Sequence, residues 1–207
     1  MKKIKSNQLK KLKSFIETSY TEVYPEPLSK LHSTITEKVL PHIVKKFNIS
    51  TSARILDVGC GQGVALNLFK KLGFSPIGIT LSDQDIQICK ASKFKVFQMD
   101  QSFLEFEKNS FDFLWSRHCL EHSLFPLFTL GEYRRVLSSG GIAYIEVPAP
   151  ETVNQHHQNK NHYSLFTREV WKSLMDRSQF KLIDSYEYTL DTSRGPDYYW
   201  SYVLKCF

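Results

Sequence analysis

Short apolar runs with a strand-like pattern alternate with helical runs along the chain from residue 52 onward. The order is ARILDVG then VALNLFKKLG, SPIGITL then DQDIQICKAS, KVFQMD, FDFLWS then FPLFTLGEYRRVL, and GIAYIEVP then TREVWKSLMDRS. Such alternation is typical of βαβ units, and near-continuous apolar strands indicate a sheet with helices on both faces. The final runs, FKLIDSYEYTL and DYYWSYVLKCF, lack an intervening helix and should pair antiparallel. The sequence predicts an α/β fold with a mostly parallel seven-stranded sheet whose last strand is antiparallel.

The first fifty residues read as helices that precede this α/β region. Residues 1–20 predict a short basic helix, and residues 28–47 predict a second helix that Pro41 should kink. The SSGG stretch at 138–141 predicts a turn before the fifth strand. We therefore divide the chain into an N-terminal helical segment at residues 1–50 and a single domain at residues 51–207.

The excess positive charge is confined to the N-terminus. The formal net charge is +6, and six lysines precede the first acid, Glu17. Without these six, 27 minus 6 leaves 21 basic residues, which equal the 21 acidic ones. A protein that grips nucleic acid usually spreads its basic residues over a binding face. The lysine segment therefore fits either a solvated helix or a contact with RNA or another acidic partner.

The cysteine pattern and the absence of long apolar runs bear on location. The four cysteines lack the spacing of a zinc site or a disulfide framework, which favours free thiols in a reducing compartment. No apolar run is long enough to span a bilayer, and the basic start is not followed by an apolar stretch. We expect a cytoplasmic protein without a membrane partner.

The stretch ILDVGCGQG, residues 55–63, places an acid directly before a glycine loop. In a dinucleotide fingerprint the glycines are spaced G-x-G-x-x-G, whereas here Gly63 comes one residue early. Asp57 would repel a diphosphate by a few kcal/mol at close range, but it would attract a cation. A ligand that combines a sulfonium or ammonium group with an adenosine suits both features.

This stretch resembles motif I of the class I S-adenosylmethionine-dependent methyltransferases. The resemblance covers about residues 50–207 in the element order of that family. It implies a Rossmann-like methyltransferase fold, methyltransferase activity and S-adenosyl-L-methionine as the cofactor. The segment before the first strand often forms a lid over the acceptor in this family, which is the role we expect for part of residues 1–50.

The resemblance also implies roles for individual positions. Asp57 and the glycine loop should hold the methionine end, and Gly63 should let the next helix pack closely. The family usually has an acid where this chain has Thr80, so Asp83 is an alternative ribose contact. Asp100 should accept from the adenine amino group, with Met99 or Gln101 against the ring. The implied cofactor site comprises Asp57, Gly59, Cys60, Gly61, Gly63, Thr80, Leu81, Asp100, Gln101 and Ser116.

Histidines gather in the loops after the fourth and fifth strands, which should face each other across the methyl donor. The catalytic candidates are His118, His156, His157 and His162, and the substrate-binding candidates are Arg117, Tyr163, Tyr20 and Tyr24. A histidine could act as general base on a hydroxyl or carboxylate, and Arg117 could pair an anionic substrate group. A divalent metal held by histidine and glutamate, or loop histidines without chemistry, remain alternatives. We assign no metal ligands from the sequence.

The acceptor class follows from what the loops contain and lack. The loop after the fifth strand is polar and nearly free of aliphatic side chains, which favours a polar or anionic small molecule over a lipid. The N/D-P-P-Y/F motif of base-amino methylation is missing, and Cys119 lacks the proline-cysteine setting of cytosine methylation. We expect methylation at oxygen of a small metabolite. The alternatives are an RNA-modifying enzyme that uses the lysine segment, and a non-catalytic cofactor-binding module.

Overall fold

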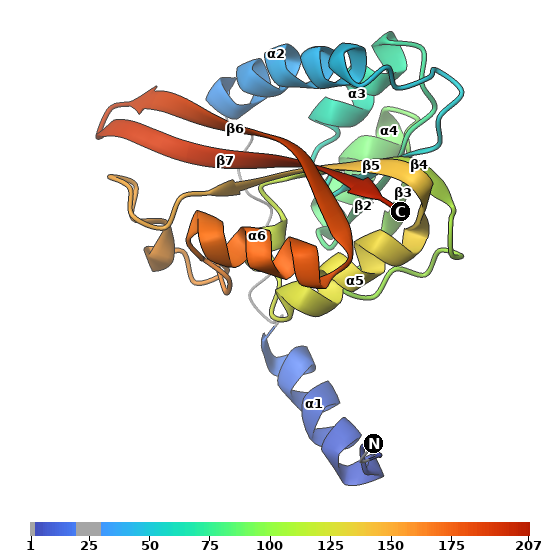
Figure 1. Ribbon diagram of the computed structural model, residues 1–207, viewed down its shortest axis with the longest axis vertical. Helices are drawn as coiled ribbons and strands as arrows, with labels where there is room; N and C mark the ends of the chain where they lie inside the picture. The colour runs from blue at the N-terminus through green and yellow to red at the C-terminus, as the bar shows by residue number, and fades with distance from the viewer. Residues whose placement is uncertain (1–2, 20–29) are drawn as a thin grey trace.

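A computed structural model describes residues 3–19 and 30–207 of the chain. Seven strands form one sheet in the order β3-β2-β1-β4-β5-β7-β6 (Figure 1), and β7 runs antiparallel to both of its neighbours. The strands are β1 (Ile55–Val58), β2 (Ile77–Thr80), β3 (Lys95–Gln98), β4 (Phe111–Arg117), β5 (Leu137–Pro148), β6 (Phe180–Thr192) and β7 (Gly195–Cys206). The predicted fold, including the antiparallel last strand, is confirmed.

Helices cover both faces of the sheet, as Figure 1 shows. One face carries α2 (Lys30–Lys46), α3 (Val64–Lys71) and α4 (Asp83–Ala91), and the other carries α5 (Pro126–Val136) and α6 (Arg168–Arg177). The first layer buries Leu40 and Phe69 against Trp115, whose ring stacks on Tyr144 with 4.2 Å between centroids. Burial of large apolar side chains on both faces supplies most of the stability of such a layer.

The two predicted N-terminal helices are present and differ in how they pack. Helix α1 (Ser6–Ser19) has no buried residue, and Figure 1 draws it away from the sheet. Helix α2 continues past Pro41 and places Leu40 and Ile43 in the core. The division of the chain at residue 50 stays a prediction. Among the described helices, none has the length and apolar character needed to cross a bilayer.

The predicted turn at residues 138–141 lies inside β5 as a local irregularity. The pairing of β4 with β5 shifts register between Phe111 and Phe113, opposite this stretch. Gly140 has a φ of 78°, and a Cβ on Gly141 would lie 2.8 Å from the Ser138 carbonyl oxygen. The glycines therefore allow a bulge within a long strand. The predicted turn before the strand is wrong, because β5 already begins at Leu137.

Candidate active site

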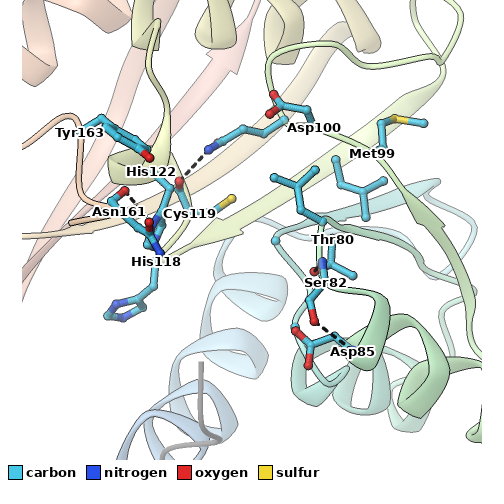
Figure 2. Close-up of a pocket in the computed structure, with 15 residues that line it drawn as sticks. Thr80, Ser82, Asp85, Met99, Asp100, His118, Cys119, His122, Asn161 and Tyr163 are labelled. Atoms are coloured by element: carbon cyan, nitrogen blue, oxygen red, sulfur yellow. Dashed lines mark hydrogen bonds between the residues drawn. The ribbon is translucent and has the colours of Figure 1, made fainter. Parts of the chain in front are cut away.

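A pocket opens at the carboxyl ends of β1, β2 and β4, where ligands bind in open α/β sheets (Figure 2). Two short 3₁₀ helices stand near it, η2 (Leu120–His122) after β4 and η3 (His156–Gln158) in the loop after β5. The predicted site residues that line the pocket are Gly59, Gly61, Thr80, Leu81, Asp100, Gln101, His118 and Tyr163. The sequence therefore brings the glycine loop, the β2 end and both histidine loops to one place.

The glycine loop is shaped by backbone geometry that other residues rarely adopt. Gly59 and Gly61 have φ values of 71° and 47°, in the left-handed region that favours glycine. A Cβ on Gly59 would lie only 2.6 Å from the Cys119 sulfur, so the loop also closely approaches the segment between β4 and η2. Cys60 does not line the pocket, and its backbone N–H donates to the Ile79 carbonyl oxygen at 2.9 Å. Gly63 precedes α3, where a Cβ would lie 3.1 Å from the Cys89 sulfur.

Asp57 lies buried behind this loop and does not itself line the pocket. Its Oδ2 has no hydrogen-bond partner in the described part of the chain. Burial raises the pKa of Asp57 to about 8, and the nearby Cys89 thiol adds to the rise. A buried, unpartnered carboxylate is costly unless a donor or a cation satisfies it. The ammonium of a bound cofactor, directly or through water, is the kind of group that would do so.

A second buried acid, Asp85, lines the pocket beside the end of β2. Its Oδ1 also lacks a hydrogen-bond partner among the described residues. Burial raises the pKa of Asp85, and this effect outweighs the hydrogen bonds with Ser82 and Gln62, which lower it. Asp83, the predicted alternative, instead accepts from the Gln98 amide at 2.8 Å and does not line the pocket. The missed signal was the capping pattern Ser82-x-x-Asp85, in which the Asp85 N–H donates to the Ser82 hydroxyl at 3.2 Å.

The expected adenine side rests on a buried hydrogen-bond chain. Gln101 donates from its amide to the Cys119 carbonyl oxygen at 2.8 Å and accepts from the Tyr133 hydroxyl at 2.7 Å. Ser116 is fully buried and contacts the same hydroxyl at 3.2 Å, so it supports the pocket without lining it. Asp100 lines the pocket and accepts from the Ser102 N–H. Met99, which was expected near the ring, lines the pocket as well.

Arg117 lies in a buried network beneath the pocket rather than on its wall. Its Nε is 2.7 Å from Oε1 of the fully buried Glu146, an ion-pair contact in which the N–H is not aimed at the oxygen. Its Nη1 donates to the His32 carbonyl oxygen and the Thr36 hydroxyl on α2. Burial would raise the pKa of Glu146, but Arg117 and His118 outweigh it and bring the pKa to about 2. This placement ties α2 to β4 and does not favour a direct contact between Arg117 and a substrate.

His118 lines the pocket and belongs to the same network. Its backbone φ is 53°, and its Nε2 lies 3.0 Å from Glu146 Oε1. Burial, followed by the charge of Arg117, lowers the pKa of His118 to about 3. A base is most effective when its pKa lies near the working pH, so His118 is a poor general base in this environment. A neutral imidazole can still orient an acceptor by hydrogen bonding.

The loop after β5 places its three histidines in different settings. His156 contacts Asp197 with its Nε2 at 3.1 Å, and its ring stacks on His162 with 5.7 Å between centroids. His162 also meets His122 edge to face at 4.8 Å, and burial with these two neighbours lowers its pKa to about 3. His157 is exposed on the loop surface. None of the three lines the pocket.

Three of the predicted substrate contacts are tyrosines. Tyr163 lines the pocket, and its hydroxyl donates to the Ser19 carbonyl oxygen at the end of α1, at 2.9 Å. Tyr20 and Tyr24 lie outside the described residues. Residues that the sequence analysis did not place at the pocket also line it, namely Ile79, Ser82, Cys119, His122 and Asn161. His122 was expected to be structural, and it reaches the pocket because η2 turns immediately after β4.

Comparison with known proteins agrees with this geometry. The chain is 26% identical to a ubiquinone biosynthesis O-methyltransferase of Pelagibacter ubique over 58% of its length and 55% of the relative's. It is 29% identical to a demethylmenaquinone methyltransferase of Staphylococcus saprophyticus over 53% of its length and 51% of the relative's. The chain thus spans about half the length of these curated relatives.

Solved structures show the same fold. An S-adenosylmethionine-dependent methyltransferase of Methanosarcina mazei superposes with a TM-score of 0.70 at 17% identity, over 80% of this chain and 97% of that one. The sequence model of a family described as a methyltransferase domain matches residues 31–185. The unpartnered Asp57 and Asp85 at the glycine loop suit the cofactor of that family. The chain therefore belongs to the methyltransferase domain family, and S-adenosyl-L-methionine is the cofactor that this membership implies.

Proposed function

We propose that this protein transfers the methyl group of S-adenosylmethionine to an oxygen atom of a small polar or anionic acceptor. The observation that carries the proposal is that the two sides of one pocket are lined by chemically different residues. Glycine-loop and acidic residues line one side, and His118, Asn161 and Tyr163 line the other with nitrogen and oxygen donors and acceptors. The names of the two relatives, an O-methyltransferase of ubiquinone biosynthesis and a demethylmenaquinone methyltransferase, support a small-molecule acceptor.

The cofactor's positive and polar groups find matching acceptors in the chain. Asp57 and the backbone of Gly59 and Gly61 would hold the methionine end. Asp85 would bind the ribose hydroxyls with the unpartnered oxygen it presents beside Thr80. An ionised carboxylate makes stronger, charge-assisted hydrogen bonds than a threonine hydroxyl does. The energetic cost of burying both carboxylates without partners is then offset when the cofactor binds.

Methyl transfer from a sulfonium asks little of a protein beyond alignment and loss of the acceptor's proton. The sulfonium is already a good leaving group, so placing the acceptor oxygen in line with the carbon–sulfur bond supplies much of the rate. His118 is the residue we assign to orient the acceptor, because Glu146 fixes its ring at the pocket wall. Tyr163 would contact the acceptor from the opposite loop. His156, His157 and Arg117 do not reach the pocket and carry no catalytic role in this proposal.

Calorimetry on paired carboxamide variants tests the cofactor site. Asp85→Asn and Asp57→Asn should each weaken S-adenosylmethionine binding by roughly 1.5–3 kcal/mol, which is the usual cost of losing a hydrogen bond to a charged group. Asp83→Asn is the matched control, because Asp83 lies on the same helix turn and points to Gln98. If Asp83→Asn and Asp85→Asn weaken binding equally, Asp85 has no specific role in the cofactor site. If Asp85→Asn or Asp57→Asn leaves the affinity unchanged, the role of that residue is refuted.

The acceptor class needs its own measurement. Transfer of labelled methyl from the cofactor to hydroxyl, carboxylate and amine acceptors of similar size should favour the oxygen acceptors. The RNA alternative predicts instead that the full-length chain binds RNA with a steep salt dependence that deletion of residues 1–13 abolishes. We expect that deletion to leave small-molecule turnover largely intact, since α1 contributes no buried residue. Absence of transfer to every acceptor class would favour a non-catalytic module.

A further inference from the structure

Three potential metal ligands meet beside the part of the pocket wall that His122 and Asn161 form. Glu121 and His122 come from η2, and His162 comes from the loop after β5. One ligand atom from each lies within 4.8 Å of the other two. Glu121 is 1% exposed, so its carboxylate is far from bulk water. Within the described residues, this is the only such group of three.

Hydrogen bonds to three backbone carbonyl oxygens fix η2 and the loop against each other. The Ser164 N–H donates to the Glu121 carbonyl oxygen at 2.9 Å, and the Ser164 hydroxyl donates to the Ser123 carbonyl oxygen at 2.8 Å. His122 Nδ1 lies 3.0 Å from the Asn161 carbonyl oxygen. Because a carbonyl oxygen only accepts hydrogen bonds, this contact requires a proton on Nδ1. These contacts bracket His162 in sequence and hold the two segments together before any ion binds.

The histidine nitrogens are arranged as metal-binding imidazoles usually are. A ligating histidine commonly donates its other N–H to a backbone carbonyl, which fixes the tautomer and the ring. In the tautomer whose Nδ1 donates to Asn161, the lone pair that can bind an ion lies on Nε2 of His122. His162 Nδ1 is buried and has no hydrogen-bond partner in the part of the chain that the structure describes. An unpartnered buried nitrogen beside a buried carboxylate is a costly arrangement that a cation would relieve.

We propose that Glu121, His122 and His162 bind one divalent transition-metal ion of the zinc type. Two imidazoles and one carboxylate favour such ions over Mg²⁺ and Ca²⁺, which prefer oxygen ligands. With ligand bonds of about 2.0–2.2 Å in tetrahedral geometry, ligand atoms lie about 3.4 Å apart, so separations of up to 4.8 Å must contract by as much as roughly 1.4 Å. His162 lies outside regular secondary structure, so this contraction would involve its side chain and the surrounding loop.

The position of this ion would deepen the proposed function, on which this part of the inference rests. His122 and Asn161 line the pocket, and three protein ligands leave a coordination position open to it. An acceptor hydroxyl bound there would lose its proton to solvent more readily, because the cation stabilises the oxyanion. The oxygen lone pair then forms the new C–O bond as the C–S bond breaks, giving a methyl ether, a neutral thioether and one released proton.

Metal binding is measured on the full chain after removal of bound metal with a chelator. Calorimetric titration with Zn²⁺ should give one site per chain, and Co²⁺ should give a visible absorption band that reports direct nitrogen ligation. His162→Gln and Glu121→Gln should each weaken Zn²⁺ binding about 100-fold or more, since each removes one of three ligands. His42→Gln is the control, because His42 is an exposed histidine on α2 outside the group.

The outcomes separate the metal site from the methyltransferase proposal. Zn²⁺ binding that His162→Gln leaves unchanged, or a stoichiometry well below one, overturns the metal site whatever the activity. Tight, ligand-dependent Zn²⁺ binding without S-adenosylmethionine binding or methyl transfer keeps the site and overturns the proposed function. S-adenosylmethionine affinity and thermal unfolding of each variant show whether it is folded. If Glu121→Gln does not fold, His162→Gln decides the question alone.

Discussion

Replacing Glu146 with glutamine should destabilise this protein far more than loss of a surface ion pair would. Glu146 is fully buried on β5 and receives Arg117 at 2.7 Å, His118 at 3.0 Å and the Tyr144 hydroxyl at 2.5 Å. At 2.7 Å and an effective dielectric constant of 20, the attraction between Glu146 and Arg117 is about 6 kcal/mol. Desolvation offsets part of this, and removing one partner of a buried pair typically costs about 3–5 kcal/mol, because the other charge stays buried. We expect a loss in that range.

Urea unfolding at pH 7, followed by circular dichroism, measures the effect. Asp112→Asn is the matched control, since Asp112 meets Arg54 at a similar 2.8 Å but both side chains are more than a third exposed. Its substitution should cost about 1 kcal/mol or less. In the double variant Glu146→Gln with Arg117→Met, the buried charge is gone, so the loss should be clearly smaller than the sum of the two single losses. A loss below about 1 kcal/mol for Glu146→Gln, or additive losses in the double variant, would refute the buried-pair reasoning.

Further predictions concern pH, a buried hydroxyl and the glycine loop. Because the folded pKa of His118 lies near 3, below the ordinary 6.5, its contribution to stability is present above pH 6.5 and falls as the pH drops toward 3. The stability difference between wild type and His118→Gln should therefore shrink by about 1.4 kcal/mol per pH unit from pH 6 to pH 4.5 in urea titrations, and a flat difference would contradict the shift. Tyr133→Phe leaves two buried polar atoms unpaired and should cost about 1–3 kcal/mol, with weaker cofactor binding by calorimetry. Gly59→Ala should lower the melting temperature more than Gly140→Ala, because both have positive φ but only Gly59 faces the Cys119 sulfur; equal losses would argue against the clash.

The elements that the sequence predicted well are those specified by local pattern. Strand and helix runs alternate with clear periodicity, which indicates a mostly parallel sheet, and the helix-free final runs indicate the antiparallel last strand. The glycine loop was also readable, because Gly59 and Gly61 occupy backbone geometry that few other residues tolerate. Asp85 could have been found from its capping pattern with Ser82, which places its side chain at the first turn of α4 beside the pocket.

The role suggested for Arg117 could not be settled locally, because its partner is distant in sequence. Arg117 and Glu146 are paired in register across β4 and β5, so they lie side by side once the two strands align. When that register is not known, an arginine at a strand end near a ligand site is readily interpreted as a contact for an anionic substrate. The same limit applies to His156, whose partner Asp197 comes from β7.

The histidines show why residue type and loop position do not define chemistry. Sequence placed His118, His156, His157 and His162 on two facing loops and treated them as one group. The structure separates them by partner: a buried carboxylate for His118, Asp197 for His156, solvent for His157, and the Glu121 and His122 pair for His162. Glu146 holds the His118 ring in place, whereas His162 Nδ1 has no hydrogen-bond partner in the described part of the chain and lies near the Glu121 carboxylate. The unpartnered His162 Nδ1 is therefore the observation that directs attention to the Glu121, His122 and His162 group, which we propose as a metal site.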